Sequence, residues 1–323
     1  MATTDASPPG PVSVTEAVRA AAAHTRDVLF PVRLERWLVL GFLAFLDQCG
    51  RSLHGGGPGG GRSETHGPWP RDGNDFARDV VEGVDRVTAW LSAHAAAVAL
   101  GALAVLLLVC GLLALVLWVN ARGTFAYLDG VASGRAEIAR PWRVHASAAH
   151  SYFGWRFGLS LATFFVVLLG AALVAAGLVG FARGQLEGLW GGAAALALLP
   201  VLLVLCVTLP LLVLAGVVLR DFVAPLQLTT GSTCGEAARV LEALVIAHPG
   251  AFVVYLLLKL VLAGGIGVAV FVGGCLTCCL GFVPIVMQTL FQPLFFFERS
   301  WPVFLLRQMG HDLPGKLVAR GNP

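Results

Sequence analysis

The chain has 323 residues, of which 57% are hydrophobic and 13% are charged, and its formal net charge is +3. Soluble domains have about a quarter of their residues charged, so this composition excludes a soluble body and indicates an integral membrane protein. The 22 Lys and Arg residues are scattered along the chain, whereas a nucleic-acid-binding surface gathers them on one face. We therefore expect the lipid bilayer as a partner, and no nucleic acid.

The first 36 residues are predicted to form a polar leader that contains one amphipathic helix. Apolar side chains recur at helical spacing over residues 14–29, with charged side chains on the opposite face. The helix begins at Ser13-Val-Thr-Glu16, which has the order of a capping box.

Two further amphipathic stretches lie at residues 74–93 and 233–247. The first could continue without a break into the apolar run from residue 95. The second begins at Thr233-Cys-Gly-Glu236 and repeats the capping-box order. All three stretches fit two interpretations: helices in the membrane interface beside the spans that they precede, or ordinary helices packed on loops.

The apolar runs predict an all-α, polytopic membrane protein with about six transmembrane helices. A spanning helix needs about 20 mostly apolar residues. The predicted spans are 37–47, 95–119, 155–181, 191–219, 251–273 and 275–297. The last two form one apolar run, and Gly273-Gly274 is predicted to turn the chain between them.

The run from Trp37 to Leu46 is the shortest of the six, with Arg36 and Asp47 on either side of it. Lys and Arg accumulate on the cytoplasmic side of membrane proteins. Six spans place 15 of them on the side of the termini and 6 on the other side, whereas omitting this run divides them 10 to 11. The charge distribution therefore favours six spans, with both termini in the cytoplasm of a bacterium and the protein in its inner membrane.

This topology predicts a single membrane domain over residues 37–299 between the leader and a cytoplasmic tail, 300–323. Within it, residues 53–74 are rich in Gly and contain three Pro, which is typical of an exposed loop. Gly56 to Ser63 imitates a phosphate-binding loop, with Arg62 in the place of the lysine. A working loop follows a buried strand, and none is predicted here.

Three segments resemble uncharacterised bacterial multi-pass membrane families. They are Gly235–Gly250 with the apolar run Ala251–Leu262, Val28–Leu46, and Arg220–Leu228. Some of these families are similar to the membrane domain attached to certain glycerophosphodiester phosphodiesterases. The resemblance implies a bacterial membrane protein. It transfers no enzyme chemistry, because no phosphodiesterase catalytic domain accompanies it.

Cys275, Cys278 and Cys279 form the one C-x-x-C pattern of the chain. Thiolates at this spacing could bind a metal or cycle with a disulfide, and a cysteine near a helix end could be acylated. A zinc site would need a second pair of ligands, and cysteine is also an ordinary small apolar residue in hydrocarbon. We therefore predict no metal site and no cofactor.

Lys259 is the single charged residue of the apolar run 251–297. It lies about 13 Å along a helix from the start of that run, close to the middle of the bilayer. An intramembrane charge suggests a functional site. The alternatives are that its side chain snorkels to the headgroups, or that it pairs with Tyr255, or with Gln288 and Gln292 of the neighbouring span.

These residues lead to two hypotheses about function. The sequence contains no catalytic constellation, so we do not expect an enzyme. The favoured hypothesis is a structural or partner-binding membrane component, with a membrane protein or a second copy of the chain as its partner. The alternative is a transporter or channel for a small molecule or an ion, with Lys259 in the pathway.

Overall fold

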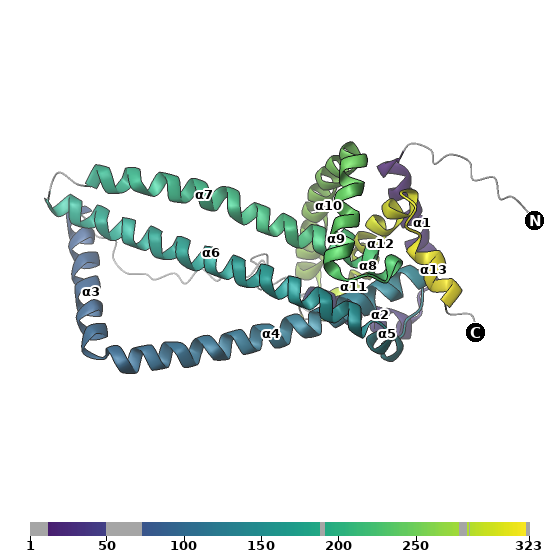
Figure 1. Cartoon of the computed structure of the whole chain (residues 1–323), viewed down its shortest axis with the longest axis horizontal. Helices are drawn as coiled ribbons and strands as arrows, with labels where there is room; N and C mark the ends of the chain where they lie inside the picture. Colours follow the sequence, from purple (N-terminus) through teal and green to yellow (C-terminus); the bar gives the residue numbers. More distant parts are fainter. Residues whose placement is uncertain (1–11, 50–72, 188–190, 278–282, 284, 321–323) are drawn as a thin grey trace, which may run out of the picture. The chain divides into compact units, whose positions relative to one another are not determined.

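The computed structural model describes residues 12–49, 73–187, 191–277, 283 and 285–320. Every regular element among them is a helix (Figure 1), which confirms the all-α prediction. The glycine-rich loop lies almost entirely outside the described residues. The elements are α1 (Val14–Leu29), α2 (Leu34–Gln48), α3 (Gly73–Ala93), α4 (Ala95–Ser133), α5 (Ala139–Val144), α6 (Ala146–Glu187), α7 (Gly191–Val218), the π-helix η2 (Leu219–Val223), α8 (Ala224–Thr230), α9 (Cys234–Ala247), α10 (Pro249–Leu276), α11 (Val286–Leu290), α12 (Gln292–Gln308) and α13 (Leu313–Arg320).

Four helical segments are long and apolar enough to cross a membrane. Among the described residues these are Ala95–Ser133, Ala146–Gly184, Leu198–Thr230 and Pro249–Leu276. No more than 11% of the most apolar stretch of each is buried inside the protein, so most of its surface is left for lipid. The four segments fit a membrane protein, but the predicted count of six is not confirmed.

The first predicted span corresponds to α2, which has only 15 residues. At 1.5 Å per residue such a helix is about 23 Å long, shorter than the hydrocarbon core of about 30 Å. Its inner face is buried, including Leu40, Leu43 and Leu46. The helix therefore packs inside the protein along much of its length.

The predicted turn at Gly273-Gly274 is wrong. Helix α10 continues through both glycines to Leu276, because a helix satisfies its own backbone groups in an apolar medium and glycine permits a turn without requiring one. The predicted span 275–297 is not one continuous helix either. It contains the short α11, then a break at Phe291, and α12 begins only at Gln292.

Helices α3 and α4 are separate elements that meet at His94. The unbroken helix that the sequence allowed from residue 74 into the apolar run does not form. The prediction followed the amphipathic spacing of α3 alone, and nothing in that spacing marks where the helix ends.

The two predicted N-caps are confirmed. The Ser13 side chain accepts the backbone N–H of Glu16 at the start of α1. Thr233 and Glu236 form both bonds of a capping box at the start of α9. The apolar faces of α1 and α9 are buried in the protein core through Ala17, Ala21, Ala237 and Leu241, which favours the interpretation of packed helices.

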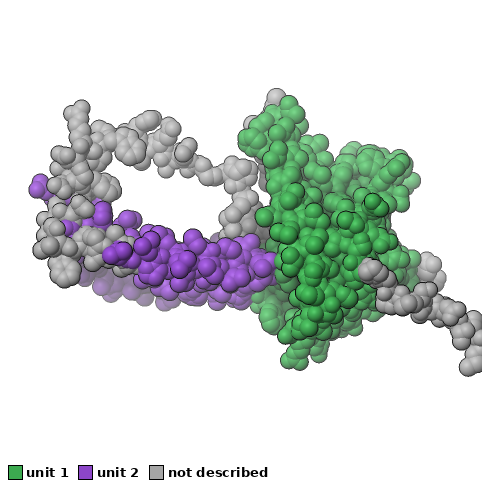
Figure 2. Space-filling view, turned by 90° about the horizontal axis from the view of Figure 1, so that it is seen from above, with its two compact units in different colours: residues 1–58, 116–156, 216–323 green, residues 59–115, 157–215 purple. Residues whose placement is uncertain are grey.

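The described chain divides into two compact units, drawn in different colours in Figure 2. Unit 1 contains residues 1–58, 116–156 and 216–323, and unit 2 contains residues 59–115 and 157–215. Helices α4, α6 and α7 each contribute residues to both units. The sequence indicated one membrane domain.

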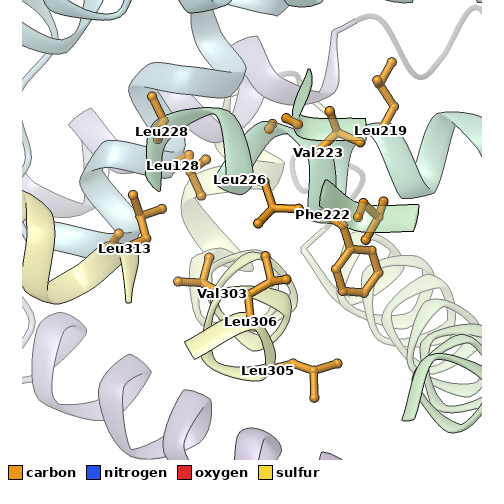
Figure 3. Packing of buried hydrophobic residues seen from close by; sticks show 14 of the residues in the cluster. Leu128, Leu219, Phe222, Val223, Leu226, Leu228, Val303, Leu305, Leu306 and Leu313 are labelled. Carbon is orange, nitrogen blue, oxygen red and sulfur yellow. The ribbon is translucent and has the colours of Figure 1, made fainter. Parts of the chain in front are cut away.

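The core of unit 1 is built around the segment from η2 to α8 and around α12. Leu219, Phe222 and Leu226 of the first segment are buried with Val303 and Leu306 of the second, and Figure 3 shows Leu226 facing Leu306 and Val303 across the core. Every residue from Leu219 to Thr229 is buried. This part of a candidate span is therefore enclosed by protein on all sides, and polar side chains on it do not face lipid.

Two glycines allow α2 to lie very close to its neighbours in unit 1. A Cβ atom on Gly41 would lie 2.2 Å from Thr289 Oγ1, and one on Gly123 would lie 2.4 Å from Leu46 Cβ. Only a residue without a side chain fits at these two positions. The close approach places the C-terminal end of α2, with Asp47, against α4.

Unit 2 is built differently, from long apolar helices with little buried surface. Its α6 and α7 approach each other at Gly170 and Gly177, where an added Cβ atom would lie 2.5 Å from Leu205 Cδ2 and 2.2 Å from Leu198 Cδ2. Small residues that let helices approach closely are the usual packing device in membranes.

Candidate functional site: a buried charge cluster

Six ionisable side chains of unit 1 come together in its interior. We call them the charge cluster. Its members are Asp47 of α2, Arg220 and Asp221 of η2, Lys259 of α10, and Glu298 and Arg299 of α12. None of the six is more than 7% exposed.

The π-helix η2 carries two of the six residues. It follows directly on α7 and leads into α8, so one candidate span passes through α, π and α geometry. Single π turns inside α-helices are rare and occur frequently at functional sites. Because the chain is buried on every side here, the consecutive residues Arg220 and Asp221 both point into protein.

Lys259 forms ion pairs with two carboxylates of the charge cluster. Its Nζ atom lies 2.9 Å from Asp221 Oδ2 and 2.9 Å from Glu298 Oε1. Lys259 is ten residues into α10, about 15 Å along the helix. Lys259 is therefore paired with carboxylates that the sequence did not suggest as partners, and its burial at 7% exposure argues against snorkelling.

Arg220 contacts three carboxylates, more than either of the other two cations of the cluster. Its Nε atom donates to Asp47 Oδ2 at 3.0 Å, and its Nη2 atom contacts the same oxygen. Its Nη1 atom lies 3.4 Å from Glu298 Oε1 and 3.5 Å from Asp221 Oδ1. One guanidinium thus contacts carboxylates from three elements, and its planar fork of donors suits that geometry.

Arg299 and Tyr255 complete the surroundings of Asp221. Arg299 Nη1 lies 3.5 Å from Asp221 Oδ1 and donates to the backbone oxygen of Arg220 at 2.6 Å. The Tyr255 hydroxyl donates to Asp221 Oδ2 at 2.9 Å. Asp221 therefore has two guanidinium groups, an ammonium group and a phenol around one carboxylate.

Asn120 of α4 fixes the end of α2 that bears Asp47. Its Nδ2 atom donates to the backbone oxygens of Leu46 at 2.9 Å and Asp47 at 2.7 Å. These carbonyls lie at the helix C-terminus, where they have no partner within the helix. The position of Asp47 is therefore set by its own helix, by Asn120 and by Arg220.

The charge cluster is balanced, with three cationic and three anionic side chains. Burying an isolated charge costs several kcal/mol, and a pair recovers this cost only with good geometry and further hydrogen bonds. Removal of any one member leaves a net buried charge. The arrangement can therefore hold α2, η2, α10 and α12 in one register.

Several buried polar atoms of unit 1, some of them in the cluster, have no hydrogen-bond partner among the described residues. They are Asp47 Oδ1, Arg299 Nε and Nη2, Gln292 Oε1, and both side-chain amide atoms of Gln227. Native proteins leave few such atoms unsatisfied. These atoms have capacity for further polar partners such as water.

The structure separates the three residues that the sequence grouped around Lys259. Tyr255 belongs to the cluster through Asp221. Gln288 instead accepts the backbone N–H of Ile285 at 2.9 Å at the start of α11, and Gln292 donates to the Tyr127 hydroxyl at 3.3 Å. The alternative that paired Lys259 with these glutamines placed them on one continuous span, which the structure interrupts, and both have other partners.

The cysteine pattern can be described only in part. Cys275 is exposed near the end of α10, whereas Cys278 and Cys279 lie outside the described residues. Within the described part of the chain, no three His, Cys, Asp or Glu side chains are grouped to hold a metal ion.

Sequence reasoning missed five of the six cluster residues. Arg220-Asp221 and Glu298-Arg299 stand directly after long apolar runs, where charged residues ordinarily mark the membrane surface. The available signal was that both are adjacent pairs of opposite charge, which can neutralise one another when buried. Asp47 has the same position, at the end of the run that forms α2.

Comparison with known proteins gives one match. A family model described as a family of unknown function, DUF7544, matches residues 12–308. No curated protein and no solved structure matches the chain, and similarity to glycerophosphodiester phosphodiesterases is not shown. The match includes all six residues of the charge cluster, and the chain belongs to the DUF7544 family.

Proposed function

We propose that this protein is a non-enzymatic structural component of the bacterial inner membrane, in which the charge cluster locks unit 1 into one arrangement. The observation that carries this proposal is the balance of the cluster, three cations against three anions, none more than 7% exposed. Intramembrane ionisable residues pair with one another when they face the interior of a helical bundle. A closed, neutral set of pairs suits a lock between helices.

The proposal is tested by comparing one neutralisation with a paired one. Lys259→Met leaves Asp221 and Glu298 without their ammonium partner, and we expect a loss of about 3–5 kcal/mol in the free energy of unfolding. Adding Glu298→Gln restores the balance of charge. We expect the double variant to recover more than half of the loss, measured by denaturant titration in mixed micelles.

Lys316→Met is the matched control, because Lys316 is the only other lysine of the chain. Its Nζ atom contacts the backbone oxygen of Thr229 and has no carboxylate partner among the described residues. Its removal should cost much less than Lys259→Met. A Lys259→Met variant as stable as the wild type, or a double variant no better than the single one, would refute the lock.

The proposed topology has six membrane crossings, with both termini in the cytoplasm. The distribution of Lys and Arg supports it, and the four apolar helices support a membrane location in general. Reporter fusions at the C-terminus and after residue 63 should report the cytoplasm and the periplasm, respectively. A cytoplasmic signal at residue 63 would mean that α2 does not complete a crossing.

The proposed partner is a membrane protein or a second copy of the chain. The support is the large apolar surface that α6 and α7 leave exposed within unit 2. Cross-linking in native membranes should give one defined product of fixed mass. A chain that stays monomeric in nanodiscs and cross-links to nothing would leave lipid as the sole neighbour.

A transport function is the second candidate, and the unsatisfied buried atoms favour it. Arg299 Nη2, Gln292 Oε1 and Asp47 Oδ1 have capacity to bind a polar substrate or an ion, and Arg299 and Asp47 belong to the same cluster as Lys259. Proteoliposomes with imposed gradients of protons, sodium and potassium test this alternative. Flux through the wild type that is lost in the folded Lys259→Met/Glu298→Gln variant would establish it, and absence of flux would count against it.

A further inference from the structure

An open groove lies in unit 1 between α2, α4 and α5, apart from the residues of the charge cluster. We call it the acyl groove. Its volume is about 520 Å³, and its lining residues are Phe42, Leu46, Val119, Ile138, Ala139, Trp142 and Arg143. Six of the seven are apolar. The volume lies in the range of small-molecule sites, about 300–1,000 Å³.

The wall that Trp142 forms is held in place by its neighbours. Arg122 Nη1 donates to the Trp142 backbone oxygen at 2.8 Å. The Trp142 ring meets the Trp118 ring edge to face at 6.3 Å between centroids, and Arg122 lies over Trp118 at 5.4 Å. The groove is therefore formed before any ligand enters it, which lowers the cost of binding.

The groove lies at the level where an apolar run ends. Trp118 and Val119 are the last residues of the apolar stretch of α4 before the polar Asn120. Tryptophan is enriched at this depth, where its ring sits at the headgroups. A ligand in the groove can thus extend from hydrocarbon to the headgroup region.

Charge at the rim of the groove is positive. Arg143 is exposed, and its Nε atom donates a hydrogen bond to the Ala139 carbonyl at 3.3 Å. Both of its Nη atoms have no partner among the described residues. The nearby Glu137 lies 3.9 Å from Arg140 and does not line the groove. No acidic side chain lines it, so the rim suits an anionic phosphate.

We propose that the acyl groove binds one chain of an anionic phospholipid, with the phosphate held by Arg143. The apolar lining, the ring of Trp142 at headgroup level and the free guanidinium donors each match one part of that molecule. The site is independent of the proposed lock, because neither proposal uses a residue of the other.

Native mass spectrometry of the full chain in detergent, titrated with phosphatidylglycerol, tests the site. We expect one lipid to bind saturably to each chain. Arg143→Gln should weaken binding about tenfold, the value of one charge-assisted hydrogen bond. Ala139→Trp fills the groove from its exposed rim and should abolish saturable binding.

Two variants serve as matched controls. Arg140→Gln removes an arginine of the same helix that does not line the groove, and Val261→Trp places the same large ring on an exposed position of α10. Neither should change the affinity. Binding that does not saturate, or equal affinities for the wild type, Arg143→Gln and Ala139→Trp, would overturn the proposal, provided that unfolding midpoints show all variants folded.

Discussion

The two units of this protein solve the problem of packing helices in a membrane in different ways. Unit 1 buries charged and polar side chains and satisfies them with one another, as in the charge cluster and in the pair of His145 Nε2 and Asp129 Oδ2 at 2.7 Å. Unit 2 brings α6 and α7 together through glycines, and its described ion pair, Arg183 with Asp85, is exposed. Unit 1 therefore adds buried ion pairs to its close-packed apolar core, whereas the described contacts between the helices of unit 2 are mainly close packing.

Buried ion pairs restrict the arrangement of helices more than apolar contacts do. Apolar helices in lipid gain little from hydrophobic burial, because the lipid tails are equally apolar. A balanced set of buried charges adds a further constraint, because any arrangement that separates a pair leaves an uncompensated charge inside the protein. We therefore expect unit 1 to be the more rigid of the two and the more sensitive to single substitutions.

The largest effect is expected from removing Arg220, the cation of the charge cluster with the most carboxylate partners. Arg220→Met leaves Asp47 without its guanidinium partner. It also removes one of the cationic partners of Glu298 and of Asp221. We expect a loss of about 3–5 kcal/mol in the free energy of unfolding, measured by denaturant titration.

The matched control for Arg220→Met lies in unit 2. Arg183 pairs with Asp85 at 2.7 Å, but both side chains are exposed. Arg183→Met should therefore cost less than about 1 kcal/mol. Equal losses for the two variants would erase the distinction between buried and exposed pairs on which the comparison of the units depends.

A smaller effect is expected from filling the close approach of α6 and α7 in unit 2. Gly177→Val places a side chain where a Cβ atom would already lie 2.2 Å from Leu198 Cδ2. Overpacking of this kind costs about 1–3 kcal/mol. Gly264→Val on α10 is the control, since nothing lies within 4 Å of a Cβ atom there, and it should leave the free energy of unfolding unchanged. A Gly177 variant as stable as its control would show that α6 and α7 are not held by packing at this glycine.

How much of the fold is visible in the sequence depends on the range of the interaction. Four apolar runs predict four membrane-capable helices, and Ser13 and Thr233 predict two helix starts, because these features depend on residues a few positions apart. The interruption before α11 was not predicted. Ile285 has a φ of 72°, a left-handed value that β-branched residues rarely adopt, and hydropathy does not register a change of backbone direction.

The candidate site was predicted only through its one unusual member. Lys259 stands alone in an apolar run, so its cost in lipid is visible without any structure. Its partners Asp221 and Glu298 stand at the ends of other runs and resemble surface residues until tertiary packing encloses them. The π geometry of η2, which turns Asp221 inward beside Arg220, has no known signature in the sequence.

The smallest effect is expected at the surface of unit 1, in the capping box of α9, and its sign depends on pH. The Glu236 carboxylate accepts the backbone N–H of Thr233 at 2.8 Å, and this bond lowers the pKa of Glu236. A lowered pKa in the folded state means that the bond stabilises the protein above the unfolded-state pKa of about 4.3 and is lost as the pH falls through the folded value. Glu236→Gln should therefore lower the free energy of unfolding slightly at pH 7, by less than Gly177→Val, and its difference from the wild type should shrink below about pH 4.

Glu242→Gln is the control, because Glu242 lies on the same helix and has no bond to the helix N-terminus. The difference between this variant and the wild type should not shrink in the same way. If it does, the effect reflects net charge and not the cap.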